Sequence, residues 1–246
     1  MKPQTLLLVL ALAGQGMPAP AAPPAQSDSA VVTVDRNADR TATHAFKFAR
    51  VPSPVADDAA AKAKRTIVDG EADPNGSVTA LTDGILPRDE DEPGANFFFD
   101  AGTAGGAVAL DLGSTIDIAQ INTYSWHPNT RGPQIYTLYA SDGTGAAFNA
   151  APKHGTDPAG AGWTRLADVN TVPKGDDLGG QYGVSITDRR GSLGRFRYLL
   201  FVCVVTETLD DYGNTFYSEI DVIARASALQ NVDDANHALP RGRDQR

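Results

Sequence analysis

The chain has 246 residues, of which 41% are hydrophobic and 21% charged. This allows one domain with flanking segments, or two small domains, and excludes a globally disordered chain. The formal net charge of −9 at pH 7 disfavours a nucleic-acid partner and charge-driven binding to anionic membranes. A single cysteine cannot form an internal disulfide, and the run LLFVCVV predicts that Cys203 is a buried apolar residue.

The first residues have the features of a targeting signal. Met1–Lys2 supplies a small positive region, and Leu6–Ala13 is an apolar run too short to span a bilayer. Ala19-Pro20-Ala21 then places small residues where a signal peptidase cleaves, with Ala11–Ala13 as a second possible site. We expect residues 1–21 to be a signal peptide and the mature protein to be soluble and secreted or periplasmic. Later apolar runs are too short to predict a transmembrane helix.

Three further segments flank the predicted domain. Residues 22–45 are rich in Ala, Pro, Ser, Asp and Thr, which is typical of a flexible linker. Residues 46–66 form an N-terminal extension, in which Ser53, Pro54 and the two following aspartates predict a short helix over about 54–64. The polar residues 226–246 predict a loosely ordered tail.

From Thr66 onward, short runs rich in Val, Ile, Tyr and Phe are separated by Gly, Asp, Asn and Pro. Strands of this length between such turns indicate an antiparallel sandwich or barrel. A parallel sheet is disfavoured, because helical patterns do not alternate with the strands. We therefore predict an all-β fold. The expected strands are residues 107–112, 116–126, 134–141, 163–170, 182–187, 195–205 and 216–224.

Six pieces of sequence occur in a characteristic order. They are LTDG (81–84), VALDLGSTIDIAQINTYSW (108–126), YTLYASDG (136–143), GW (162–163), RFRYLLFVC (195–203) and SEIDVIA (218–224). Together they resemble the discoidin-like (coagulation factor 5/8 type C) domains of the galactose-binding-like superfamily. The resemblance implies a jelly-roll β-sandwich over residues 67–225. EDEPGANFFFDAGTAGG and GNTFYSEIDV are similar to an uncharacterised subgroup of secreted bacterial proteins in this superfamily.

The resemblance implies a structural calcium ion. Its family ligands come from the early DG loop and from a Glu in the last strand, which match Asp83 and Glu219 here. Calcium prefers six to eight oxygen ligands, and the turn TDGILPRDEDE supplies carboxylates and carbonyls from one loop. The alternative is that Asp83 only forms a turn and Glu219 is an exposed strand residue. The acidic residues 89–92 are interpreted as a solvated loop and not as ligands.

The resemblance also implies a sugar site on loops at one end of the sandwich. Sugar-binding members combine an aromatic ring, which stacks on the apolar face of a sugar, with His, Arg and Asn, which bind hydroxyl groups. The alternative is structural: Trp126 packs in the core, Arg131 pairs with a carboxylate, and Pro128 and Pro133 only shape the loop. The matching candidates are Trp126, His127, Asn129 and Arg131 in WHPNTRGP, and Tyr212 and Asn214 in DDYGNTF.

We therefore predict a non-catalytic binding module for a glycan or polysaccharide. The alternative is an adhesion or structural module for a protein partner such as a cell-surface protein, with NFFFDAG (96–102) as its contact surface. An enzyme is not predicted, because adjacent carboxylates such as Asp176-Asp177 and Asp210-Asp211 are usually just solvated. The sequence also lacks a G-x-S-x-G motif and a P-loop.

Overall fold

The computed structural model describes residues 29–153, 155–206 and 213–226. Its strands pair only in antiparallel fashion, which confirms the predicted all-β fold. No helix of this described part is long and apolar enough to cross a membrane. The strands are β1 (Ala30–Ala38), β2 (Lys64–Asp69), β3 (Gly105–His127), β4 (Ile135–Ser141), β5 (Thr164–Asn170), β6 (Gly180–Asp188), β7 (Gly194–Val204) and β8 (Tyr217–Ala224); the short 3-10 helices are η1 (Asp39–Thr41), η2 (Val78–Thr82), η3 (Pro93–Ala95) and η4 (Pro158–Ala161).

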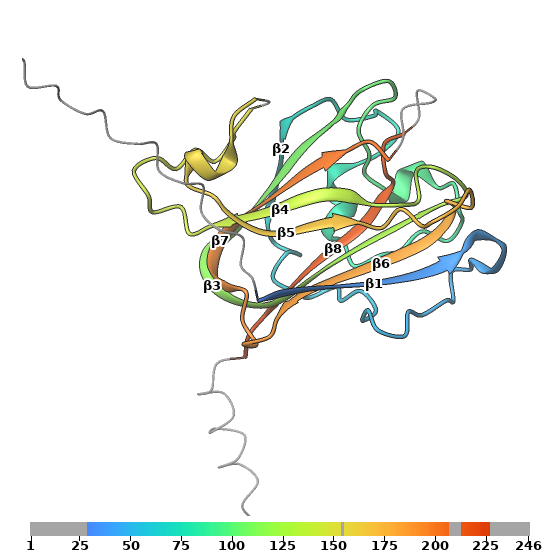
Figure 1. Ribbon diagram of the computed structural model, residues 1–246, viewed down its shortest axis with the longest axis horizontal. Coiled ribbons are helices and arrows are strands. Elements are labelled where there is room, and N and C mark those ends of the chain that lie inside the picture. Colours follow the sequence, from blue (N-terminus) through green and yellow to red (C-terminus); the bar gives the residue numbers. More distant parts are fainter. Residues whose placement is uncertain (1–28, 154, 207–212, 227–246) are drawn as a thin grey trace, which may run out of the picture.

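Strand β3 belongs to both layers of the sandwich (Figure 1). In the first layer, the first half of β3 pairs with β2 and β7, β7 also pairs with β4, and β4 pairs with β5. In the second layer, the second half of β3 pairs with β6 and β8, and β6 also pairs with β1. Between the halves the register with β7 shifts from Asp111 to Ile116. Gly113 has a φ of +80° there, which a residue with a side chain rarely adopts. The two predicted strands 107–112 and 116–126 are therefore one bent strand.

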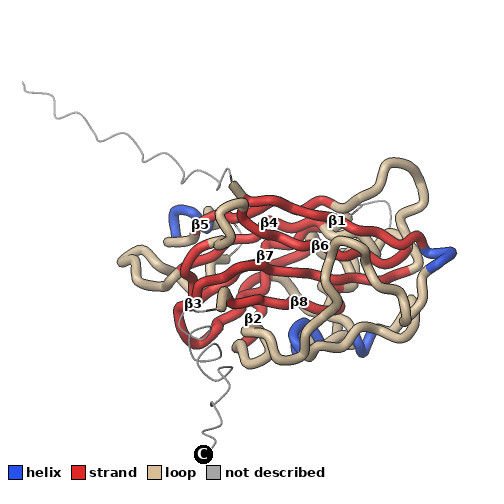
Figure 2. The backbone as a smooth tube through the Cα atoms, turned by 90° about the horizontal axis from the view of Figure 1, so that it is seen from below, coloured by secondary structure: helices blue, strands red, loops and turns tan. Residues whose placement is uncertain are grey.

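The main hydrophobic core lies between these two layers, whose strands overlap in the view of Figure 2. Leu110, Leu138 and Leu199 come from one layer, and Ile121 and Val222 from the other, and all are fully buried. Cys203 belongs to this core, and burial raises the pKa of its thiol to about 12. The prediction of a buried cysteine is confirmed.

The prediction of a linker over 22–45 is wrong for its second half. Residues 30–38 form β1, and all nine pair with β6 from Ala30↔Asp188 to Ala38↔Gly180. The β-branched run AVVTV is the signal for this strand, because such residues fit a pleated surface. The predicted signal peptide, residues 22–28 of the linker, and residues 227–246 of the tail lie outside the described residues.

The predicted helix over 54–64 is also wrong, because this segment forms turns. Some of its polar groups bond to β8. The N–H of Ala59 donates to the carbonyl oxygen of Val222 (3.0 Å), and the N–H of Val222 donates to a carboxylate oxygen of Asp58 (2.8 Å). Asp58 also accepts from the N–H of Ala60 (2.6 Å), so it caps a turn against β8. Docking on the sheet overrides the local helical preference.

Candidate functional site

The loop after β3 meets the loop before β8 at one end of the sandwich. The N–H of Phe216 donates to the carbonyl oxygen of Arg131 (2.9 Å), and Nε of Arg131 donates to the carbonyl oxygen of Asn214 (3.1 Å). Thr215 adds a hydrogen bond from its hydroxyl to the carbonyl oxygen of Pro133 (2.6 Å). The two segments that were predicted to carry the site are therefore bonded to each other.

The guanidinium group of Arg131 packs against two phenylalanine rings. Its Cζ lies 4.0 Å from the ring centroid of Phe216 and 4.6 Å from that of Phe98. The two rings stack on each other with centroids 4.1 Å apart. Cation–π contacts of this kind contribute about 0.5–2 kcal/mol. We call Phe98, His127, Arg131, Asn214 and Phe216 the Arg131 cluster.

His127 is buried against the same cluster. Its ring makes an edge contact with Phe216 at 4.6 Å between centroids. Nδ1 accepts from the N–H of Asn129 (3.3 Å), so the neutral ring carries its proton on Nε2, which lies 3.9 Å from a carboxylate oxygen of Asp91. Burial, with a smaller contribution from Arg131, lowers the pKa of His127 to about 4. His127 is therefore neutral near pH 7 and can donate through Nε2.

The other predicted binding residues are placed differently. Asn129 is exposed beside the cluster, whereas Asn214 is buried and its amide donates to the carbonyl oxygen of Asp100 (2.8 Å). Trp126 is 6% exposed and lines a small cavity with Phe46 and Phe48 of the N-terminal extension, which no member of the cluster lines. The structure thus does not bring Trp126 to this site and supports its interpretation as a packing residue. Tyr212 lies outside the described residues.

Two residues near the site were not predicted from the sequence. Asp91, whose side chain is 65% exposed, faces His127, although the acidic run 89–92 was interpreted only as a solvated loop. Phe98 supplies one of the two rings under Arg131. It comes from the FFF run, where alternation sends Phe97 and Phe99 into the main core and Phe98 to the opposite side.

The predicted calcium ligands lie in neighbouring segments but differ in exposure. Glu219 is fully buried, and its carboxyl group accepts from the N–H groups of Gly84 (2.6 Å) and Ile220 (3.1 Å). Burial raises the pKa of Glu219 to about 9, and the nearby carboxylates of Asp221 and Asp83 also raise it. Asp83 is exposed, and its carboxylate accepts from the N–H of Ile85 (2.9 Å).

This arrangement fits a cation only in part. A buried carboxyl group beside two other acidic groups is a place where a cation would reduce repulsion. However, the parts of the chain that the structure describes hold no group of three or more His, Cys, Asp or Glu side chains placed to bind a metal ion. Further ligands would have to be other oxygen atoms, such as backbone carbonyls, side-chain amides or water.

No protein-family model matches this sequence, and no curated protein matches it. Among solved structures, 64 chains match. One is a CBM32 module named CpGH89CBM32-6, produced by Clostridium perfringens, with 17% identity over 69% of this chain and 100% of that chain, and a TM-score of 0.40.

Two other matches have different partners. The CBM32 of AlyQ in complex with 4,5-unsaturated mannuronic acid is 14% identical over 65% of this chain and 93% of its own, with a TM-score of 0.36. Reduced XRCC1 bound to the DNA polymerase β catalytic domain is 10% identical over 66% of this chain and 94% of its own, with a TM-score of 0.43. Matches with such low identities and TM-scores do not identify a ligand of this chain.

Proposed function

We propose that this protein is a non-catalytic carbohydrate-binding module that recognises a glycan or polysaccharide at the loop end of the sandwich. The observation that carries this proposal is the Arg131 cluster. Arg131 is held against the stacked rings of Phe98 and Phe216 and bonded to Asn214, so its position is fixed before any ligand arrives. A group that is already ordered loses little entropy on binding.

The polar groups beside the cluster suit hydroxyl recognition. Asp91 accepts hydrogen bonds, Asn129 both donates and accepts, and the neutral ring of His127 donates through Nε2. The rings of Phe98 and Phe216 are 2% and 1% exposed, so they position Arg131 and do not form a stacking platform. We therefore expect recognition to depend on hydrogen bonds to the edge of a sugar and to be of modest affinity.

The proposal is tested on a glycan array and by pull-down with insoluble polysaccharides. Asp91→Asn and Asn129→Ala change exposed side chains, so both variants should fold and lose binding. Asp89→Asn is the matched control, because it removes the same charge from an exposed residue two positions away and should bind normally. A blank array and a blank pull-down, or undiminished binding by both variants, would overturn the proposal.

We propose in addition that a calcium ion binds between the loop of Asp83 and Glu219 on β8, with backbone carbonyl oxygens completing its shell. The buried carboxyl group of Glu219 and its contact with the N–H of Gly84 support this placement. The ion would supply positive charge that ties this loop to β8. We also propose export through the signal peptide at residues 1–21, a proposal that rests on the sequence.

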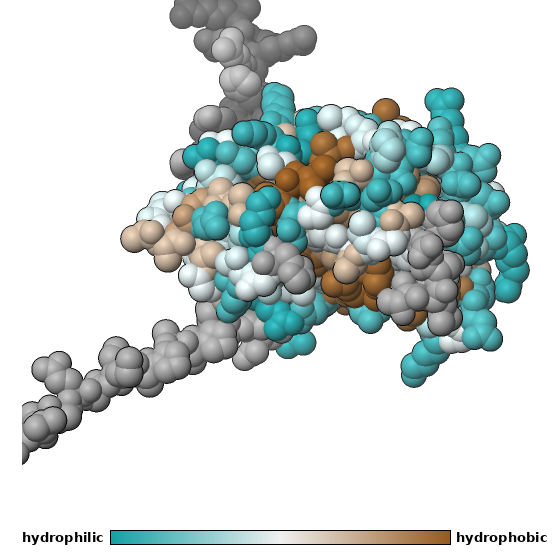
Figure 3. Space-filling model, turned by 90° about the horizontal axis from the view of Figure 1, so that it is seen from above, coloured by the Kyte–Doolittle hydropathy of each residue, from teal (hydrophilic) through white to brown (hydrophobic). Residues whose placement is uncertain are grey.

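The alternative of a protein-binding module loses its predicted surface. Phe97, Phe98 and Phe99 are at most 2% exposed, so NFFFDAG offers no apolar contact face. The exposed large hydrophobic residues of the described chain are Val32, Ile85 and Val204, which belong to three separate elements. Seen from above, apolar residues form separate patches in a mostly hydrophilic surface (Figure 3). No specific observation favours this second function.

A further inference from the structure

A cavity opens on the outer face of the sheet formed by β2, the first half of β3, β7 and β4. It has a volume of about 360 Å³ and is walled by the β4–β5 connection. We call it the sheet-face pocket. None of its lining residues belongs to the Arg131 cluster. Its volume lies within the range of roughly 300–1,000 Å³ that is typical of small-molecule sites.

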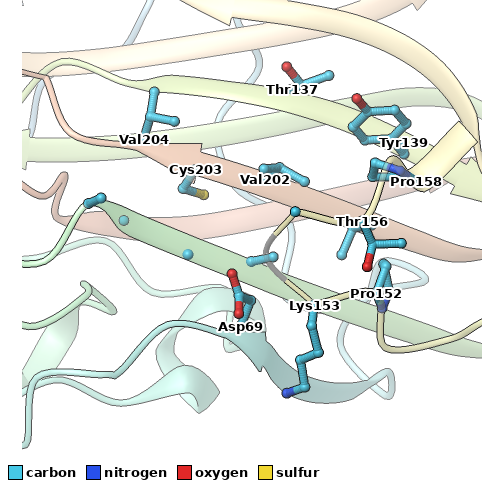
Figure 4. A pocket seen from close by; sticks show the side chains of 16 residues that line it. Asp69, Thr137, Tyr139, Pro152, Lys153, Thr156, Pro158, Val202, Cys203 and Val204 are labelled. Carbon is cyan, nitrogen blue, oxygen red and sulfur yellow. The ribbon is translucent and has the colours of Figure 1, made fainter.

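The pocket has an apolar floor and polar walls. Figure 4 shows Val202 of β7 in the middle, Thr137 and Tyr139 of β4 on one side, and Asp69 and Lys153 on the opposite side. Val202 and Tyr139 are half-buried and pack against a small outer hydrophobic cluster. The ring and the valine therefore present a firm apolar surface beneath an open mouth.

Hydrogen bonds to other parts of the chain hold two of the walls in place. The ammonium group of Lys153 donates to the carbonyl oxygen of Val68, which fastens the β4–β5 connection to β2. The hydroxyl of Thr137 donates to the carboxylate of Asp168 on β5 (2.9 Å). The pocket is thus a defined part of the fold and not a loose gap beneath a loop.

The chemistry of the walls selects among ligand classes. Asp69 and Lys153 carry opposite charges on the same side, so a strongly charged ligand gains little. An added peptide strand is excluded, because β7 is already paired with β3 and β4 and leaves no free edge. A neutral ring with one apolar face and a polar edge matches the valine and tyrosine floor together with the hydroxyl and charged groups of Asp69, Lys153 and Thr156.

We propose that the sheet-face pocket binds a neutral mono- or disaccharide as a second site, separate from the loop end. The sugar would lay its CH face on Val202 and Tyr139 and direct its hydroxyl groups to Asp69 and Thr156. This inference rests on the proposed function for the ligand class but uses entirely different residues. Two sites on one domain raise avidity for a polysaccharide without any new contact.

The test is calorimetric titration with lactose, cellobiose and N-acetylgalactosamine. Thr156→Trp fills the pocket from an exposed loop position, and Asp69→Asn removes its carboxylate. Thr144→Trp is the matched control, because Thr144 is exposed on the same connection but does not line the pocket. We expect the wild-type protein to bind sugar at two sites. The affinity of one site should fall by roughly tenfold or more in Thr156→Trp and Asp69→Asn, and the same site should keep its affinity in Asn129→Ala.

The outcomes separate the two proposals. Loss of binding only in Asn129→Ala overturns the pocket site and leaves the loop-end site. Loss only in Thr156→Trp supports the pocket and overturns the loop end. No binding of any of the three probes overturns both. If the pocket variants fail to fold, the methyl signals of Val202 in the wild-type protein decide the question: a shift on adding the bound sugar supports the site, and an unchanged spectrum contradicts it.

Discussion

Arg131 and Phe216 are joined twice, through their backbones and through their side chains. The N–H of Phe216 donates to the carbonyl oxygen of Arg131, and the guanidinium carbon lies 4.0 Å from the centroid of the phenylalanine ring. These residues are far apart in sequence and belong to the loops after β3 and before β8. Their contact therefore closes one end of the sandwich and places the other polar groups of that end.

Arg131→Ala should destabilise the fold by about 2–3 kcal/mol, because it removes the cation–π contacts and the donor to the carbonyl oxygen of Asn214. The stability of Arg131→Lys should lie between those of the wild-type protein and Arg131→Ala, since an ammonium group keeps the charge but lacks the planar guanidinium group. Urea unfolding measures both. Arg165→Lys, at an exposed ion pair with Asp168, is the control and should change little. If Arg131→Ala is as stable as the wild-type protein, the contacts of Arg131 with the two rings do not stabilise the fold.

His127 should make stability depend on pH below neutrality. Its pKa in the fold is about 4, below the ordinary value of 6.5, so the unfolded chain binds the extra proton between these values. His127 therefore does not lower the free energy of unfolding above pH 6.5. As the pH falls from 6.5 towards 4, the free energy of unfolding should decrease by on the order of 2 kcal/mol. His127→Phe keeps a ring against Phe216 but cannot titrate, and should flatten this slope.

The measurement is the free energy of unfolding at several pH values from 4 to 7. Other acidic groups titrate in this range, so the difference in slope between the wild-type protein and His127→Phe isolates this histidine. Parallel curves for the wild-type protein and His127→Phe would mean that His127 takes up its proton without cost in the fold.

The strands could be predicted from the sequence wherever the residues alternate between an apolar and a polar face, as in AVALDL and QIYTLYAS. β1 was missed because the flanking Ala, Pro and Ser residues resemble a linker. The predicted helix over 54–64 failed because Asp58 caps a turn against β8, a tertiary contact that local propensity does not contain. Pairing between distant segments decided both cases.

At the candidate site, residue types predicted which loops carry polar side chains, and the structure brings His127, Arg131 and Asn214 together. What the sequence did not show is how these side chains are used. Arg131 and Asn214 bond to protein groups, and Trp126 packs under the N-terminal extension. The roles of Asp91 and Phe98 depend on contacts across the fold, so spacing along the chain carries no signal for them.

The N-terminal extension should be a stable part of the fold, and Gly183 tests this. A Cβ at Gly183 would lie 2.9 Å from two ring atoms of Phe48, so Gly183→Ala should displace the ring and cost roughly 1–3 kcal/mol. In a Phe48→Ala background the same change should cost much less, because the obstacle is gone. A double-mutant cycle by urea unfolding measures this coupling. Purely additive effects would mean that Phe48 does not rest on β6.

Calcium should raise the melting temperature if the ion binds only the folded chain. Binding of that kind stabilises by RT ln(1 + [Ca²⁺]/Kd), about 2.7 kcal/mol at a hundredfold excess over Kd. Glu219→Gln keeps an oxygen that accepts from the N–H of Gly84 but cannot ionise to bind a cation, so it should fold and lose the shift between EDTA and excess calcium.

The second proposed ligand, Asp83, is exposed and is tested in the same way by Asp83→Asn. Asp142→Asn, at an exposed turn elsewhere, is the control and should keep the wild-type shift. A shift that survives in Glu219→Gln would place the ion at another site. If calcium does not change the melting temperature of the wild-type protein, the proposed structural calcium ion is contradicted. The sandwich itself would stand, because its core is formed by residues such as Leu110, Leu138 and Val222.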